Sequence, residues 1–139
     1  MEILLVEDNP GDVRLTREAL KEAKIQNQLH VVEDGVAAME FLYQKGPYVD
    51  APRPHLILLD LNLPKKDGRE VLQEIKQNPA LKRIPVVVLT TSRDKKDILT
   101  SYDLHANCYV TKPVELDQFI QIAKSIDNFW LTTVSLPNE

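Results

Sequence analysis

The chain has 139 residues, of which 43% are hydrophobic and 27% charged, and its formal net charge is −4. This composition excludes a disordered chain and is that of one soluble globular domain, and the acidic balance argues against nucleic-acid binding as the main activity. The single cysteine, Cys108, excludes an internal disulfide and a cysteine-based zinc cluster. No apolar run reaches the ~20 residues that cross a bilayer, and Met1–Glu7 lacks the basic start of a signal peptide, so we expect a cytoplasmic protein that does not enter the membrane.

Short apolar runs alternate with longer segments of helical periodicity along the chain. Such runs are typical of strands buried on both faces, and we predict five, at residues 3–6, 29–32, 56–59, 85–89 and 108–110. Predicted helices begin at Asn9-Pro10 and at Asp34-Gly35, a third stops at Asn78-Pro79, and two more cover about residues 92–105 and 114–128. Strict alternation implies a parallel sheet with helices on both faces, which is an α/β three-layer sandwich.

The predicted helices carry apolar residues at three- and four-residue steps, which mark the faces expected to pack on the sheet. A loop with several prolines, at residues 46–54, separates the second helix from the third strand. The three histidines are far apart in the chain and match no metal-ligand spacing. The inward helix positions are Val13, Thr16, Leu20 and Ala23; Ala38, Phe41 and Leu42; Val71, Leu72 and Ile75; and Leu116, Phe119, Ile120, Ala123 and Ile126.

Polar residues end four of the five predicted strands. Glu7-Asp8 follows the first strand, Asp60 the third and Thr90 the fourth, and Lys112 comes just after the fifth. Because the carboxyl ends of parallel strands lie along one edge, ligands bind at that edge in sheets of this kind. In a sheet of order 2-1-3-4-5 the first and third strands are neighbours, so three carboxylates are expected to meet in one pocket.

Three carboxylates at close range repel one another, by about 4 kcal/mol for each pair at ~4 Å. A lysine or a divalent cation can offset that repulsion. Mg²⁺ prefers oxygen ligands and suits this pocket better than zinc, because no histidine or cysteine is at hand. A carboxylate beside Mg²⁺ and Lys112 can also act as a nucleophile that forms an aspartyl phosphate, and the Thr90 hydroxyl can donate a hydrogen bond to the attached group.

The chain resembles the receiver domain of two-component response regulators over about residues 2 to 127. Four motifs carry this resemblance, in the order and at the spacing of the family: Leu5–Asn9, Leu58–Pro64 with Gly68 following, Leu89–Ser92, and Tyr109–Pro113. One departure is His105-Ala106, where the family usually has Gly-Ala; it affects a helix end and not the pocket. The resemblance implies a flavodoxin-like fold with five parallel strands in the order 2-1-3-4-5 and five helices.

The resemblance also implies a role for each pocket residue. Asp60 would accept a phosphoryl group from a sensor histidine kinase, and Lys112 would bridge Asp60 and that group. Mg²⁺ would be bound directly by Asp8, by Asp60 and by the main-chain carbonyl of Asn62. Glu7 would act on the metal mostly through water.

A conformational switch follows from the same resemblance. Thr90 would move toward the phosphate, and the Tyr109 ring would turn inward to fill the space that Thr90 leaves. The Lys112-Pro113 bond is expected to be cis. Such a domain is not an enzyme in the usual sense, since it catalyses only its own phosphorylation and slow dephosphorylation. Its output passes to a partner protein through a shifted equilibrium between two surfaces.

A finer likeness is to the single-domain regulators that partner cyanobacterial-type phytochrome kinases. This likeness is based on Asn9–Asp12, on the proline-bearing loop at 47–54 and on the tail motif Phe129-Trp130-Leu131. We expect a receiver domain at residues 1–127 and a C-terminal tail at 128–139, with no output domain. The apolar tail either folds back over the domain or forms a self-association surface, and the subgroup likeness favours a homodimer.

Other interpretations of the same residues remain open at this stage. The acids at the strand ends can be solvated surface groups, and Tyr109 can be a packing residue. A magnesium phosphohydrolase of the haloacid-dehalogenase type also uses an aspartyl phosphate, but it places an Asp where this chain has Asn62. A receiver-like adaptor that takes no phosphate would be expected to lack a pocket residue, and none is missing.

Overall fold

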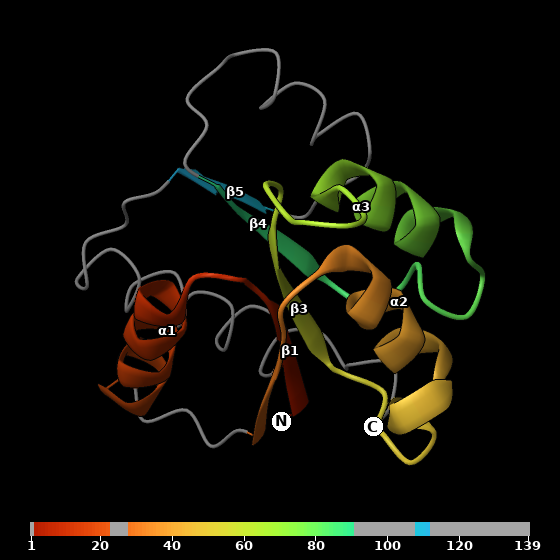
Figure 1. The fold of residues 1–139 in the computed structure, drawn as a ribbon, viewed down its shortest axis with the longest axis horizontal. Helices are drawn as coiled ribbons and strands as arrows, with labels where there is room; N and C mark the ends of the chain where they lie inside the picture. The colour runs from red at the N-terminus through yellow and green to blue at the C-terminus, as the bar shows by residue number, and fades with distance from the viewer. Residues whose placement is uncertain (1, 23–27, 91–107, 112–139) are drawn as a thin grey trace.

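The fold is built on one parallel sheet, as Figure 1 shows. The computed structural model describes residues 2–22, 28–90 and 108–111. The order of its strands is β2-β1-β3-β4-β5, which confirms the predicted order. The helices predicted at 92–105 and 114–128, Lys112 and the tail lie outside the described residues. The strands are β1 (Glu2–Val6), β2 (Gln28–Val32), β3 (Leu56–Asp60), β4 (Val86–Thr90) and β5 (Cys108–Thr111).

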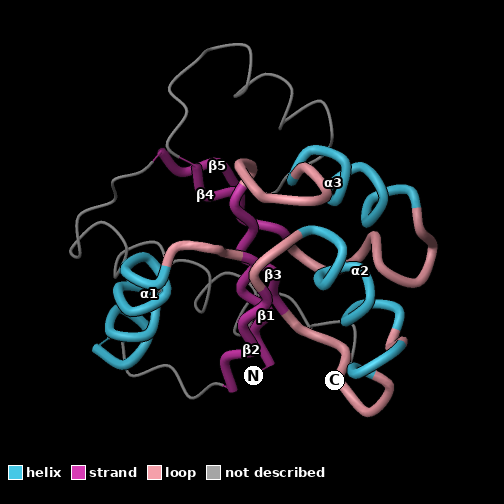
Figure 2. The backbone as a smooth tube through the Cα atoms, in the orientation of Figure 1, coloured by secondary structure: helices cyan, strands magenta, loops and turns pink. Residues whose placement is uncertain are grey.

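Helices cover both faces of the sheet. Helix α1 (Pro10–Glu22) lies on one side, and α2 (Gly35–Tyr43) and α3 (Gly68–Gln77) lie together on the other (Figures 1 and 2). A short 3-10 helix, η1 (Gly46–Tyr48), interrupts the proline-bearing loop that leads to β3. In the described part of the chain, no helix is both long enough and apolar enough to span a membrane.

Short polar side chains determine where the helices begin. Asn9, Asp34 and Asp67 each accept a hydrogen bond from a backbone N–H two or three residues further on, at 2.7 to 3.2 Å. Such N-caps satisfy amides that have no partner inside the helix. The caps at Asn9 and Asp34 confirm the predicted helix starts, whereas the cap at Asp67 was not predicted.

The hydrophobic core has one part on each face of the sheet. Successive strand residues point to opposite faces, so Leu4 and Val6 pack with α2 and α3 while Ile3 and Leu5 are buried on the other face. This two-sided burial explains why β1, β3 and β4 are almost continuous apolar runs. The expectation of the same burial for residues 29–32 is wrong, because β2 lies at the edge of the sheet and buries only Val32. Among the predicted inward residues that the structure describes, all are buried except Val13, which is only half-buried, and Ala23 lies outside the described residues. The buried ones are Thr16, Leu20, Ala38, Phe41, Leu42, Val71, Leu72 and Ile75.

Lys76 on α3 holds the loop that leads to β4. Its Nζ donates hydrogen bonds to the carbonyl oxygens of Lys82 at 3.2 Å and of Ile84 at 2.9 Å. Burial disfavours the charged ammonium and so lowers the pKa of Lys76 below its ordinary value of 10.5. Between the lowered pKa and 10.5 the unfolded chain binds more protons than the folded one, so the free energy of unfolding rises with pH in that window.

Lys76→Met is expected to remove this alkaline gain in stability, because the substituted side chain carries no proton to release. The measurement is urea unfolding of both proteins at a series of pH values from neutral to just below 10.5. Lys82→Met, at an exposed position, is the matched control and should keep the wild-type pH dependence. Equal pH dependence in wild type and Lys76→Met would show that burial of Lys76 has no such effect.

Candidate functional site

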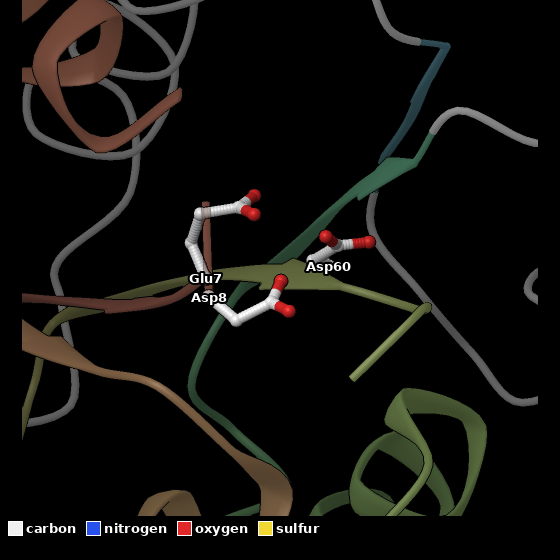
Figure 3. Close-up of side chains that lie close together, drawn as sticks. All are labelled: Glu7, Asp8 and Asp60. Carbon is white, nitrogen blue, oxygen red and sulfur yellow. The ribbon is translucent and has the colours of Figure 1, made fainter. Parts of the chain in front are cut away.

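Three carboxylates from two neighbouring strands meet at the carboxyl edge of the sheet. Glu7 and Asp8 directly follow β1, and Asp60 is the last residue of β3, whose Leu59 lies opposite Val6. One oxygen from each carboxylate lies within 4.8 Å of the others. Figure 3 shows the three side chains reaching into the same space from the ends of the two strands. The prediction that these three carboxylates lie close together is therefore confirmed. We call this group the acidic cluster.

The acidic cluster is buried on one side and open on the other. Glu7 and Asp60 are 2% and 5% exposed, whereas Asp8 is exposed to solvent. Backbone amides hold the two buried groups: Asn9 N donates to Glu7 Oε1 at 3.1 Å, and Asn62 N donates to Asp60 Oδ1 at 2.9 Å. Each carboxylate is thus oriented by the turn that follows its own strand, and a ligand can approach past Asp8.

The donor atoms of the acidic cluster fit a hard divalent cation. At 4.8 Å and an effective dielectric of ~20, each pair of ionised carboxylates repels by about 3 kcal/mol. A divalent cation held among these carboxylates offsets this repulsion. The ligands are all oxygens, which favours Mg²⁺, Mn²⁺ or Ca²⁺ over zinc. Among the described His, Cys, Asp and Glu residues, this is the one group compact enough to hold a metal ion.

The loop between β3 and α3 carries Asn62 and has a strained turn. Lys66 N donates to Pro64 O at 2.8 Å across Lys65, whose φ is +66°. A three-residue turn of this γ type with positive φ is rare for a residue other than glycine and stores conformational strain. Strained turns often lie next to functional sites, and this one begins four residues after Asp60.

Two glycines pack this loop against its neighbours. A Cβ on Gly68 would lie 2.6 Å from Leu61 Cα and would also collide with the carbonyl oxygen of Asp60, so α3 begins directly against the end of β3. A Cβ on Gly35 would collide with the carbonyl oxygen of Lys66. The start of α2 therefore presses on the loop after Asp60. The sequence predicted a helix start at Gly35 and a loop at Gly68, but not which residues these glycines touch.

The remaining predicted site residues are only partly covered by the structure. Thr90 is the last residue of β4, next to β3, and Tyr109 lies in β5 opposite Val88. The side chains of both, and all of Lys112, lie outside the described residues. The parts assigned to Thr90, Tyr109 and Lys112 therefore stay predictions.

At the opposite end of the sheet, two histidines each contact Glu2, and the sequence did not predict either contact. His30 Nε2 lies 2.5 Å from Glu2 Oε2, and His55 Nδ1 accepts a hydrogen bond from Glu2 N at 2.9 Å. These residues lie 28 and 53 positions from Glu2, so no spacing in the sequence could have revealed the contact. The pair ties β2 and the start of β3 to the first residue of β1.

Comparison with known proteins agrees with this geometry. The model of the response regulator receiver domain matches residues 3–124. The chain belongs to the response regulator receiver family. Response regulator Rcp1 of Synechocystis sp. is 60% identical over 135 residues, which are 97% of this chain and 92% of that protein. The family match favours the receiver interpretation over the phosphohydrolase.

Two solved receiver structures are similar along almost the whole chain. The Mn²⁺-bound form of response regulator Rcp1 has a TM-score of 0.86 and 60% identity over 98% of both chains. The phosphorylated cyanobacterial phytochrome response regulator RcpA has a TM-score of 0.87 and 59% identity, over 98% of this chain and 97% of that one. This receiver domain is thus a signalling module with the family's parallel α/β fold.

Proposed function

We propose that this receiver domain is a phosphorylation switch in which Asp60 accepts a phosphoryl group from a sensor histidine kinase. The observation that supports this most is the acidic cluster, in which one oxygen each of Glu7, Asp8 and Asp60 lies within 4.8 Å of the others. Asp60 has the central place because it ends the buried strand β3 and is oriented by the amide of Asn62. The similarity to a phosphorylated response regulator supports the same chemistry.

The transfer replaces one bond to phosphorus by another. A carboxylate oxygen of Asp60 attacks the phosphorus of the kinase phosphohistidine, the P–O bond forms, and the P–N bond breaks as the imidazole leaves with its electron pair and takes up a proton. Lys112 pairs with the transferred group, and the Thr90 hydroxyl donates to one of its oxygens. Tyr109 then turns into the space that Thr90 leaves, which completes the switch.

The proposed cofactor is Mg²⁺, held by Asp8, Asp60 and the main-chain carbonyl of Asn62, with Glu7 acting mostly through water. The all-oxygen donor set supports this choice, as does the Mn²⁺ found in the similar Rcp1 structure, because both ions take carboxylate and carbonyl ligands. When bound, the ion offsets the negative charge that builds on the phosphoryl oxygens.

The proposed donor is a phytochrome-like histidine kinase, and the receiver acts in the cytoplasm. The 60% identity to Rcp1 and the 59% identity to a cyanobacterial phytochrome response regulator support this partner class. We place the receiver at residues 1–127 and the tail at 128–139, with output through a downstream protein. The tail motif Phe129-Trp130-Leu131 either folds back over the domain or forms the contact of a homodimer.

The test of phosphoryl acceptance uses acetyl phosphate, a donor that needs no kinase. The wild-type chain with acetyl phosphate and Mg²⁺ should gain the mass of one phosphoryl group in intact-protein mass spectrometry, and excess EDTA should prevent the gain. Transfer from a phosphorylated phytochrome kinase should be faster than from an unrelated histidine kinase. No mass gain with acetyl phosphate under any metal condition would refute the proposal, and equal transfer rates would refute the partner class alone.

Removal of Asp8 should abolish metal binding without damage to the fold. At a Mg²⁺ concentration of about 100 times its Kd, binding adds about 2.7 kcal/mol of stability, which raises Tm by several degrees. Asp8→Asn should lose most of this rise, because the substitution deletes one ligand charge at an exposed position. Differential scanning fluorimetry with and without Mg²⁺ measures the rise in Tm of the wild type and of Asp8→Asn. A full Mg²⁺-dependent rise in Asp8→Asn would remove Asp8 from the ligand set.

A further inference from the structure

A pocket of about 340 Å³ lies at the amino edge of the sheet, away from the acidic cluster. It forms where β2 and α2 face the loop that carries η1, before the start of β3. This volume suits a small organic ligand or one long side chain. The residues that line it include His30, Phe41, Pro47, Tyr48 and Pro52, together with the acidic residue Asp50.

Hydrogen bonds within the loop hold the outer wall of the pocket in place. Gln44 Nε2 donates to Ala51 O at 2.7 Å, which closes the loop on itself. Inside the loop, Tyr48 N donates to Lys45 O and Ala51 N donates to Tyr48 O, both at 3.0 Å. Prolines at 47, 52 and 54 restrict the backbone further. The pocket is therefore largely formed before any ligand arrives.

Aromatic rings form the inner walls. The Phe41 ring lies 5.4 Å from the His30 ring and 5.5 Å from the Tyr48 ring, tilted by 49° and 56°. The face of an aromatic ring attracts a cation placed over it, so aromatic lining residues suit a cationic ligand. The same loop already uses this attraction, since Lys45 Nζ lies 5.3 Å from the centre of the Tyr43 ring.

The charge of the lining also favours a cation. Asp50 is exposed, and its carboxylate has no hydrogen bond or ion pair with any residue that the structure describes. The imidazole of His30 is already engaged by Glu2 at 2.5 Å. An anion entering the pocket would meet an unneutralised carboxylate, whereas a cation would pair with it.

We propose that the pocket formed by β2, α2 and the η1 loop binds an organic cation, a guanidinium or ammonium group on a short apolar stem. The stem packs between Phe41, Tyr48 and the prolines, and the charged head lies near Asp50 at the pocket mouth. Such a group can come from a free small molecule or from an arginine or lysine side chain of a partner protein. The site is separate from the acidic cluster and does not depend on phosphorylation.

The probe pair is n-butylguanidinium and n-butylurea, which have nearly the same shape and differ in charge. Titration of the ¹⁵N-labelled full chain followed by NMR should shift the amide signals of His30, Tyr48 and Ala51, with millimolar affinity for the cation. The cation should bind about three- to tenfold more tightly than the neutral compound, as expected for one cation–π contact with an exposed ion pair. Equal affinity of the two compounds, or no shift with either, would overturn the proposal.

Two variants test the named contacts. Asp50→Asn removes only an exposed charge and should reduce the preference for the cation to less than about twofold. Tyr48→Leu keeps an apolar side chain but removes one ring. It should weaken binding of the cation more than binding of the neutral compound. Glu18→Gln removes the same charge from the exposed surface of α1 and should change nothing. A preference for the cation that survives Asp50→Asn and Tyr48→Leu would contradict the assignment.

A third titration separates the two sources of the cation. N-acetylarginine N-methylamide carries the same group with a peptide backbone on both sides. If it binds as tightly as n-butylguanidinium, the pocket accepts a side chain of a partner protein. If only the free cation enters, the ligand is a small molecule. Both results require cation binding, so each supports the site while it identifies the source.

Discussion

Asp60→Asn is expected to abolish phosphoryl uptake from acetyl phosphate while it makes the metal-free protein more stable. Uptake is lost because an amide oxygen is a much poorer nucleophile than a carboxylate. Stability rises because one of three mutually repelling charges within 4.8 Å disappears, and we expect a gain of about 1 to 3 kcal/mol in the free energy of unfolding. The amide keeps an oxygen that can accept the hydrogen bond from Asn62 N, so the turn after β3 is preserved.

Intact-protein mass spectrometry measures the uptake, and urea unfolding in EDTA measures the stability. The combination of lost uptake and gained stability cannot come from misfolding, which would lower both. Glu18→Gln removes a carboxylate from the exposed face of α1 and should leave uptake unchanged. If Asp60→Asn gained the phosphoryl mass as the wild type does, another residue would be the acceptor.

Gly68→Ala is expected to destabilise the protein by about 2 kcal/mol or more, because the new methyl group collides with backbone that cannot move alone. The Cβ would lie 2.6 Å from Leu61 Cα and 2.9 Å from Leu61 O. Relief requires α3 to move away from the end of β3, which also displaces the turn that orients Asp60. Gly35→Ala should destabilise the protein by a similar amount, since its Cβ would lie 2.7 Å from Lys66 Cβ and 2.8 Å from Lys66 C.

Urea unfolding followed by circular dichroism measures these changes. Gly11→Ala is the matched control, because its Cβ would approach only one side-chain atom, Asn9 Oδ1, at 3.2 Å, and alanine favours the helix. We expect that variant to be neutral or slightly more stable. Wild-type stability in Gly68→Ala would mean that α3 has more room at its start than the structure shows.

Local features of the chain were predicted well because their energetics are local. The apolar run that ends in Asp60, the cap at Asn9 and the cap at Asp34 depend on residues within a few positions, and all three are present. Periodicity located the buried faces but not their depth, so Val13, on the predicted apolar face of α1, is only half-buried. Strict alternation of strands and helices was enough to predict the parallel sheet and, with the family resemblance, its strand order.

The sequence by itself thus determined the fold class, the strand that presents Asp60 and the chemistry available at the sheet edge. Only the tertiary structure decided the 4.8 Å spacing of the acidic cluster, the fit of Gly35 against Lys66, and the rings that line the pocket at the amino edge. The physical reason is that strands and caps follow from neighbours along the chain, whereas these contacts join residues that lie close only after the strands have paired and both faces of the sheet are covered.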